Sequence, residues 1–144
     1  MDNFKFYTEL KVRYEETDAM SVVYYGKYFV FFEVARTEYL KNIGHNYVDI
    51  EENGFYFMVV ESNCKYYNPA RYDDDLRIFT KIEYVRNSSF NFLYEVVKEK
   101  NGGKIRIAKG NTVLVCVSNK DFKPRRIPEY LRIAIQDFEN TPIG

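Results

Sequence analysis

The sequence predicts an α+β fold in which a five-stranded antiparallel sheet wraps around one long central helix. Three observations predict it. Residues 28–43 carry apolar side chains at helical spacing nearly all round, which only a covered helix tolerates. Five other segments are predicted strands, either because apolar and polar residues alternate, as one buried face requires, or because the segment is rich in aromatic and β-branched residues. Their order, one strand, then the helix, then four strands, allows a single curved sheet to enclose the helix.

The first part of the chain carries clear boundary signals. Residues 4–15 alternate with a period of two and are expected to form the first strand. Gly44 ends the long helix as a left-handed cap. Because the helix charges lie mainly in its second half, we expect its N-terminus in the interior and its C-terminus facing outward. Asn46 should cap a short helix that stops at Gly54.

The later strands are expected over residues 55–67, 76–84, 90–100 and 104–118. Asn101-Gly102-Gly103 predicts a hairpin between the last two strands. Gly110, inside the last strand, predicts a β-bulge. Pro128 is expected to open a final helix.

Composition limits the classes of function. The 144 residues suit a single domain over 1–144, and 46% hydrophobic with 18% aromatic residues indicates a globular chain. Twenty-one basic residues balance 21 acidic ones, so the whole-protein charge gives no reason to expect a nucleic-acid partner.

The cysteines and the N-terminus indicate a compartment. Cys64 and Cys116 fall in apolar strand patterns without metal-ligand spacing, so buried free thiols are expected, with one disulfide as the alternative. Asp73-Asp74-Asp75 has no spaced partner ligands and is interpreted as a solvated turn, so we expect no metal site. Neither a leader nor a membrane span is indicated, and a cytoplasmic location is expected.

Asp18 stands one loop upstream of the long helix. A helix start carries unpaired backbone N–H groups and a partial positive charge, so it attracts the oxygen of a polarised carbonyl. If the loop folds back, the carboxylate and these donors face each other across a gap that holds one carbonyl carbon. Chemistry at a carbonyl needs this combination of a base or nucleophile with preorganised donors.

The motif around Asp18 resembles a known family. The run R-Y-x-x-T-D-A-x-x-V-V-Y-Y-x-x-Y from Arg13, followed by F-F-E-x-A-R-T-E-Y-L, is similar to the hot-dog-fold acyl-CoA thioesterases of the 4-hydroxybenzoyl-CoA thioesterase type. The resemblance implies that Asp18 is the catalytic carboxylate and that the backbone N–H of Tyr25 polarises the thioester carbonyl. It also implies dimers with active sites at the subunit interface, often within tetramers. Ser21 departs from the glycine usual in the family, and many members carry His where this chain has Tyr25.

Other residues have structural alternatives. Asp18 in a Thr-Asp-Ala loop could simply cap a turn, and the Tyr25 phenol could pack a pocket wall. Glu33 and Arg36 are spaced as a helix ion pair. His45, the single histidine, follows the far end of the helix, so a dyad with Asp18 is not expected.

Two groups of residues are candidates for substrate binding. The acyl pocket is expected to draw on the aromatic residues Tyr24, Phe57 and Tyr66. The nucleotide end of coenzyme A is assigned to a turn with one arginine and two hydroxyls, and to two lysines: Arg86, Ser88, Ser89, Lys27 and Lys65. An ordinary polar turn is the equal alternative for residues 86–89.

The sequence thus predicts an acyl-CoA thioesterase acting on a small aromatic or short-to-medium-chain acyl group, with Asp18 as base or nucleophile. No cofactor is expected, since coenzyme A is part of the substrate. Unpaired strand edges predict a homodimer, or a tetramer of such dimers. The alternatives are an acyl-carrier-protein thioesterase, a non-catalytic acyl-CoA-binding hot-dog protein, and a different small α+β ligand-binding fold.

Overall fold

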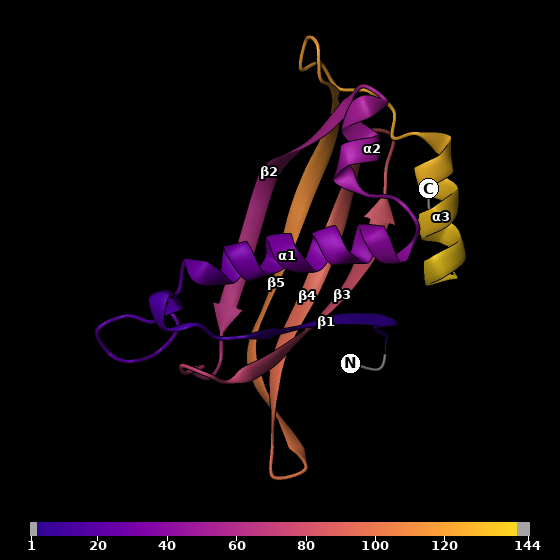
Figure 1. The fold of residues 1–144 in the computed structure, drawn as a ribbon. Coiled ribbons are helices and arrows are strands. Elements are labelled where there is room, and N and C mark those ends of the chain that lie inside the picture. Colours follow the sequence, from indigo (N-terminus) through magenta and orange to yellow (C-terminus); the bar gives the residue numbers. More distant parts are fainter. Residues whose placement is uncertain (1–2, 141–144) are drawn as a thin grey trace.

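A computed structural model describes residues 3–140, and Figure 1 shows one twisted sheet with a long helix lying across one of its faces. Residues 1–2 and 141–144, which belong to the expected single domain, lie outside the described range. The elements in chain order are β1 (Phe6–Lys11), the short 3-10 helix η1 (Tyr14–Glu16), α1 (Lys27–Asn42), α2 (Tyr47–Glu52), β2 (Phe55–Tyr66), β3 (Asp75–Val85), β4 (Ser89–Lys100), β5 (Gly103–Ser118) and α3 (Glu129–Glu139).

The sheet has five strands in the order β1-β3-β4-β5-β2, with every neighbouring pair antiparallel. The predicted α+β architecture is therefore confirmed. The strand boundaries are close to those expected, except that β1 is shorter than the predicted residues 4–15. Asn46 caps α2 by accepting a hydrogen bond from the Asp49 N–H at 2.9 Å, as its position in the sequence predicts.

Helix α1 is seated on the sheet by one ring stack. The Phe32 ring of α1 lies parallel to the Tyr94 ring of β4, with centroids 4.2 Å apart and planes 2° from parallel. A Cβ at Gly110 would come within 2.6 Å of the Phe32 ring and would collide with the Asn63 carbonyl oxygen. The glycine is thus explained by the close approach of the helix.

The prediction of a β-bulge at Gly110 is wrong. Gly110 pairs in regular register with Cys64 of β2 and Tyr94 of β4. The irregularity between β4 and β5 occurs instead at Val96/Val97. A glycine in a strand can mark either a bulge or a close backbone approach, and local sequence does not distinguish the two.

The expectation that the chain covers α1 on all sides is also wrong. Buried residues form a broad stripe, namely Tyr28, Phe31, Phe32, Ala35, Arg36, Tyr39 and Leu40. Phe29, Val30 and Val34 remain 38%, 47% and 40% exposed. The described chain therefore leaves an apolar strip of this helix uncovered.

The two ends of α1 match the expectation only in part. At its head Tyr28 is buried but Tyr25 is 62% exposed. At its end Lys41 and Asn42 are exposed as expected, whereas Tyr39 is fully buried. Figure 1 shows the reason, since α3 lies beside the C-terminal end of α1 while the N-terminal end reaches the open side of the sheet. The buried Tyr39 hydroxyl donates to Glu139 of α3, and the same carboxylate accepts the Ile82 N–H at 3.2 Å. Burial and this carboxylate raise the pKa of Tyr39.

Arg36 forms the predicted helix ion pair with Glu33 and also contributes to the core. Its Nη2 lies 3.9 Å from the Glu33 carboxylate, but its side chain is only 9% exposed. The guanidinium lies against the phenols of Tyr47 and Tyr94 and opposes the rise that burial causes in their pKa values. Arg36 therefore connects α1 to α2 and to β4 inside the core.

The Asp73-Asp74-Asp75 turn is held by lysines. Lys11 Nζ lies 3.6 Å from Asp73 and 2.9 Å from Asp75, and Lys98 Nζ lies 3.0 Å from Asp74. Within residues 3–140, no group of three or more metal-ligating side chains gathers at one place. Cys64 and Cys116 are free thiols. No helix in the described range is long and apolar enough to cross a membrane.

Replacement of Gly110 by alanine should destabilise the fold by about 3 kcal/mol, because the added methyl group meets a ring and a backbone oxygen that cannot both move away. Urea unfolding measures the loss. Gly103→Ala on the same strand is the matched control, since its Cβ would meet nothing closer than 3.7 Å. Equal stabilities for the two variants would contradict this account of Gly110.

Candidate active site

The loop that carries Asp18 is a tight reversal of the chain. Thr17 and Val23 form an isolated antiparallel bridge. Inside it, the Asp18 N–H donates to the Val22 carbonyl at 2.8 Å, and the Ser21 N–H donates to the Asp18 carbonyl at 2.9 Å. This reversal brings the aspartate back towards the start of α1, as the sequence predicts.

Asp18 uses one carboxylate oxygen to hold its loop. Oδ1 accepts the Met20 N–H at 2.8 Å and lies 3.5 Å from the Val22 N–H. Oδ2 has no hydrogen-bond donor among residues 3–140. Turn capping and chemistry are therefore compatible, because each can use a different oxygen of the same carboxylate.

The head of α1 begins with a β-turn. The Lys27 N–H donates to the Tyr24 carbonyl at 2.9 Å, which closes the turn from Tyr24 to Lys27. In this part of the chain, the N–H groups of Tyr25 and Gly26 have no protein acceptor within the described residues. Two adjacent donors at a helix start form the kind of concavity that binds an oxyanion.

Asp18 and Tyr25 line the same hollow. It has a volume of about 310 Å³, and its walls are formed by the Asp18 loop, the first turn of α1 and the end of β2: Asp18, Met20, Val22, Val23, Tyr25, Tyr28, Tyr66, Tyr67, Asn68 and Pro69. The Asp18 loop and the helix head therefore border one hollow within a single chain.

Tyrosine rings dominate the walls of this hollow. The Tyr66 ring meets Tyr28 edge-on at 5.4 Å and Tyr25 at 6.5 Å. Burial, followed by interactions with Cys64, raises the pKa of Tyr66 to about 12. Burial likewise raises the pKa of Tyr28. Both phenols stay protonated at neutral pH, so they present hydroxyl donors and apolar ring surface.

Tyr24, Lys27 and Phe57 do not line the hollow. The Tyr24 ring lies on Tyr25 at 4.6 Å, and a hydrogen bond with the Tyr25 phenol raises the pKa of Tyr24. Phe57 packs in the core edge-on to Phe90, at 4.9 Å. Lys27 is half-buried in the first turn of α1.

The turn of Arg86, Ser88 and Ser89 lies at the opposite end of the sheet. Tyr66 aligns through β5 with Val96 of β4, whereas Ser89 begins that strand. Seven residues at ~3.3 Å each separate the two levels by roughly 23 Å. Arg86 lies over the Tyr84 ring at 4.4 Å. A single chain therefore does not bring this turn to Asp18.

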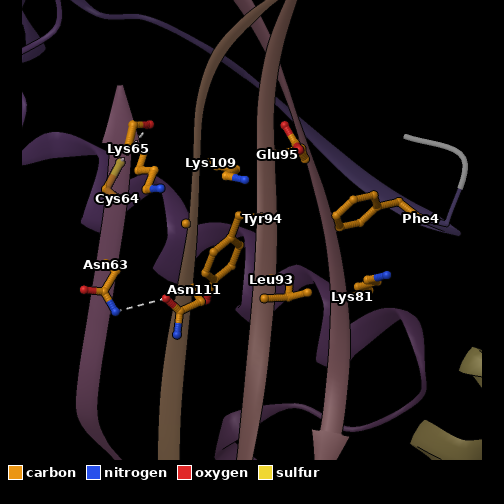
Figure 2. A pocket seen from close by; sticks show the side chains of 11 residues that line it. Phe4, Asn63, Cys64, Lys65, Lys81, Leu93, Tyr94, Glu95, Lys109 and Asn111 are labelled. Atoms are coloured by element: carbon orange, nitrogen blue, oxygen red, sulfur yellow. Dashed lines mark hydrogen bonds between the residues drawn. The ribbon is translucent and has the colours of Figure 1, made fainter. Parts of the chain in front are cut away.

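Lys65 lies on the other face of the sheet. Figure 2 shows it at a separate hollow, of about 350 Å³, with Lys81, Leu93, Glu95 and Lys109. Successive residues of a strand point to opposite faces of the sheet, so Tyr66 lines the hollow that contains Asp18 and Lys65 does not.

Sequence reasoning missed Tyr28, Tyr67, Asn68 and Pro69 as walls of the hollow. The available signal was the cluster Tyr66-Tyr67-Asn68-Pro69, whose aromatic side chains continue to the last residue of an expected strand. Knowing that this strand end meets the Asp18 loop requires the tertiary structure. His45 contacts Tyr130, at 5.0 Å between ring centroids, and is not among the residues that line the hollow.

A family model described as thioesterase superfamily matches residues 20–105, which include the helix head and the end of β2. The chain belongs to this superfamily. This thioesterase is 34% identical over 129 residues to the acyl-CoA thioester hydrolase YbgC of Escherichia coli, covering 90% of this chain and 94% of the relative. It is 30% identical over 126 residues to the acyl-CoA thioesterase YbgC of Haemophilus influenzae, covering 87% of this chain and 90% of the relative.

Solved structures agree with the fold. The DHNA-CoA thioesterase of Staphylococcus aureus superposes with a TM-score of 0.82 at 30% sequence identity, covering 95% of each chain. The resemblance to hot-dog thioesterases inferred from the Asp18 motif is therefore confirmed, and this thioesterase is a thioester hydrolase with the hot-dog fold.

Ser21 adopts the left-handed backbone conformation, with φ of 64°. Ser21→Gly should stabilise this thioesterase by about 0.5–1 kcal/mol, because glycine adopts this conformation without the steric cost of a Cβ. Thermal or urea unfolding measures the gain, with Ser21→Ala as the control that keeps the strain. A loss of stability in Ser21→Gly would show that the Ser21 side chain outweighs its backbone cost.

Proposed function

We propose that this thioesterase hydrolyses acyl-CoA thioesters, with Asp18 as base or nucleophile and the N–H of Tyr25 as oxyanion donor. The observation that carries the proposal is the shared hollow, which is lined both by Asp18 and by Tyr25, whose N–H has no acceptor among the described residues. The relatives named acyl-CoA thioesterases support the substrate class.

The chemistry requires only water besides the substrate. In the general-base route, Asp18 Oδ2 takes a proton from water while the water oxygen bonds to the thioester carbon. The carbonyl oxygen gains negative charge and accepts hydrogen bonds at the helix head. The carbon–sulfur bond then breaks, and the sulfur takes a proton to yield the free acid and the CoA thiol.

In the nucleophilic route, an Asp18 oxygen attacks the same carbon and expels the CoA thiolate. The resulting mixed anhydride is hydrolysed by water in a second step. Both routes use the same carboxylate and donors, and neither needs a metal or cofactor, so we propose that the enzyme works without one.

The acyl group fits the tyrosine-lined hollow, and Tyr28 and Tyr67 join Tyr66 as its proposed walls. Aromatic walls of this size suit a small aromatic or short-to-medium aliphatic acyl group. We propose a cytoplasmic location because acyl-CoA is an intracellular metabolite.

We propose that a homodimer completes the site. Strand β2 is an edge of the sheet, and its Met58, Val59 and Val60 are 43%, 49% and 59% exposed. The uncovered strip of α1 adds further apolar surface. Antiparallel pairing of two β2 strands about a two-fold axis would cover this edge.

The same symmetry explains where the predicted CoA contacts can act. Antiparallel β2 strands place the Phe55 end of one chain beside the Tyr66 end of the other. The turn with Arg86, Ser88 and Ser89 lies towards the Phe55 end, since Ser89 pairs with Val115 and Phe55 with Ser118. The partner's copy of this turn would thus approach the Asp18 hollow with its arginine and hydroxyls.

Asp18→Asn should lower kcat by about 10²–10⁴-fold on a panel of acyl-CoA substrates, since the amide accepts the Met20 N–H but supplies no base or nucleophile. Thiol release measures the rate. Glu15→Gln is the control, because Glu15 is exposed on the same segment and contacts Arg13.

Full activity in Asp18→Asn would contradict the mechanism. A wild type that binds but hydrolyses no acyl-CoA would indicate the non-catalytic hot-dog alternative. Faster turnover of a matched acyl-carrier-protein thioester would favour the carrier-protein alternative. A single turnover in ¹⁸O-water tests the nucleophilic route: label in the Asp18 carboxylate would establish the anhydride, with water attacking its aspartyl carbon, whereas label only in the product acid fits both the general-base route and attack of water on the acyl carbon of the anhydride.

Val60→Lys should convert the dimer to a monomer and lower activity at least 10-fold, because the two-fold axis brings like charges together on the desolvated edge. Light scattering measures the mass. Ile133→Lys, on the exposed face of α3, is the control with 52% exposure in the native chain. If the Val60→Lys variant were monomeric and fully active, one chain would be sufficient for catalysis, and the proposal that a dimer completes the site would be wrong.

A further inference from the structure

The hydroxyl of Tyr66 holds the backbone at the head of α1. It donates a hydrogen bond to the Tyr25 carbonyl oxygen at 3.0 Å. Tyr66 is the last residue of β2, so the donor sits on the sheet, while its acceptor lies in the turn before the helix. The edge contact with Tyr28 at 5.4 Å keeps the Tyr66 ring against the first turn of α1.

This bond fixes the second of two consecutive peptide groups. The first, between Tyr24 and Tyr25, is oriented by the Lys27 N–H, which donates to the Tyr24 carbonyl at 2.9 Å. The second, between Tyr25 and Gly26, is oriented by Tyr66. Because the N–H and C=O of a peptide group point in opposite directions, holding the two carbonyls also aims the N–H groups of Tyr25 and Gly26.

The Tyr25–Gly26 peptide group needs a restraint because glycine occupies the third position of the turn. Gly26 is the third residue of the turn and has φ −69° and ψ −20°, the values of a type I turn. Rotation of the Tyr25–Gly26 peptide would give a type II turn, in which the third residue has positive φ and is favourably glycine. The rotation would reverse the Gly26 N–H and leave the Tyr24–Lys27 hydrogen bond intact.

We propose that Tyr66 is a positioning residue whose hydroxyl holds the Tyr25–Gly26 peptide so that its N–H joins the Tyr25 N–H as a second oxyanion donor. The proposal rests on the proposed thioester hydrolysis and deepens it. Tyr66 then acts through the backbone, in addition to its place in the wall of the hollow. Its hydroxyl remains protonated well above neutral pH, because burial and Cys64 raise its pKa to about 12.

Tyr66→Phe keeps the ring and removes the donor. We expect kcat to fall about 10–100-fold with KM changed less than threefold, since the lost group stabilises the transition state rather than the bound substrate. Tyr7→Phe is the control, because Tyr7 lies on β1 against Phe79 and Arg77, away from the hollow.

A second substitution tests the peptide rotation. Gly26→Ala disfavours positive φ and so opposes the type II turn. Placed in the Tyr66→Phe background, it should recover at least threefold in kcat. The single variant Gly26→Ala supplies the baseline, because its Cβ would lie 2.9 Å from a Tyr24 ring carbon and displace that ring. A wall residue that only packs the acyl group would show no such recovery.

An NMR measurement is independent of turnover. In Tyr66→Phe the amide signals of Tyr25 and Gly26 should shift or broaden, and Gly26→Ala should sharpen the Tyr25 signal again. Unchanged amide signals, or full kcat in Tyr66→Phe while Asp18→Asn is inactive, would overturn the positioning role and leave the proposed function standing. If the wild type hydrolyses no acyl-CoA, the proposed function fails, and the amide signals still decide whether Tyr66 holds the peptide.

Discussion

The contact on which the site depends is the flat stack of Phe32 on Tyr94 above the bare backbone of Gly110. A helix this close to a sheet has little freedom to slide or rotate, because tight packing transmits any shift to its neighbours. The stack lies less than two helical turns from Tyr25. It therefore sets the position of the helix head relative to the end of β2, and with it the distance over which Asp18 and the backbone donors face each other.

The hollow brings together three segments that are separate in the sequence: the Asp18 loop, the turn at Tyr25 and the last residue of β2. In the proposed mechanism, each supplies a different part of carbonyl chemistry. The loop provides a carboxylate with one oxygen bonded and one available, the turn provides N–H groups at the positive end of a helix, and the strand provides rigid support. Preorganisation of this kind costs no rearrangement during the reaction.

The single chain leaves apolar surface and a strand edge open. Strand β2 is an edge of the sheet, and Val30, Val34 and Tyr25 are exposed. The proposed homodimer would cover both the exposed apolar surface and the unpaired backbone of the β2 edge. The buried Arg36, held against Tyr47 and Tyr94, connects α1 to α2 and β4.

The sequence by itself determined the elements, because hydrophobic period, caps and turn residues act within a few residues of the chain. It also determined that an acid precedes a helix start, which pointed to Asp18 and the Tyr25 backbone. Only the tertiary structure decided that Gly110 lies under a ring rather than in a bulge, that Lys65 and Tyr66 face opposite sides of the sheet, and that Ser89 begins β4 roughly 23 Å along the sheet from the level of Tyr66. These depend on which segments meet in space and on the direction of each side chain, and neither quantity is encoded by local spacing.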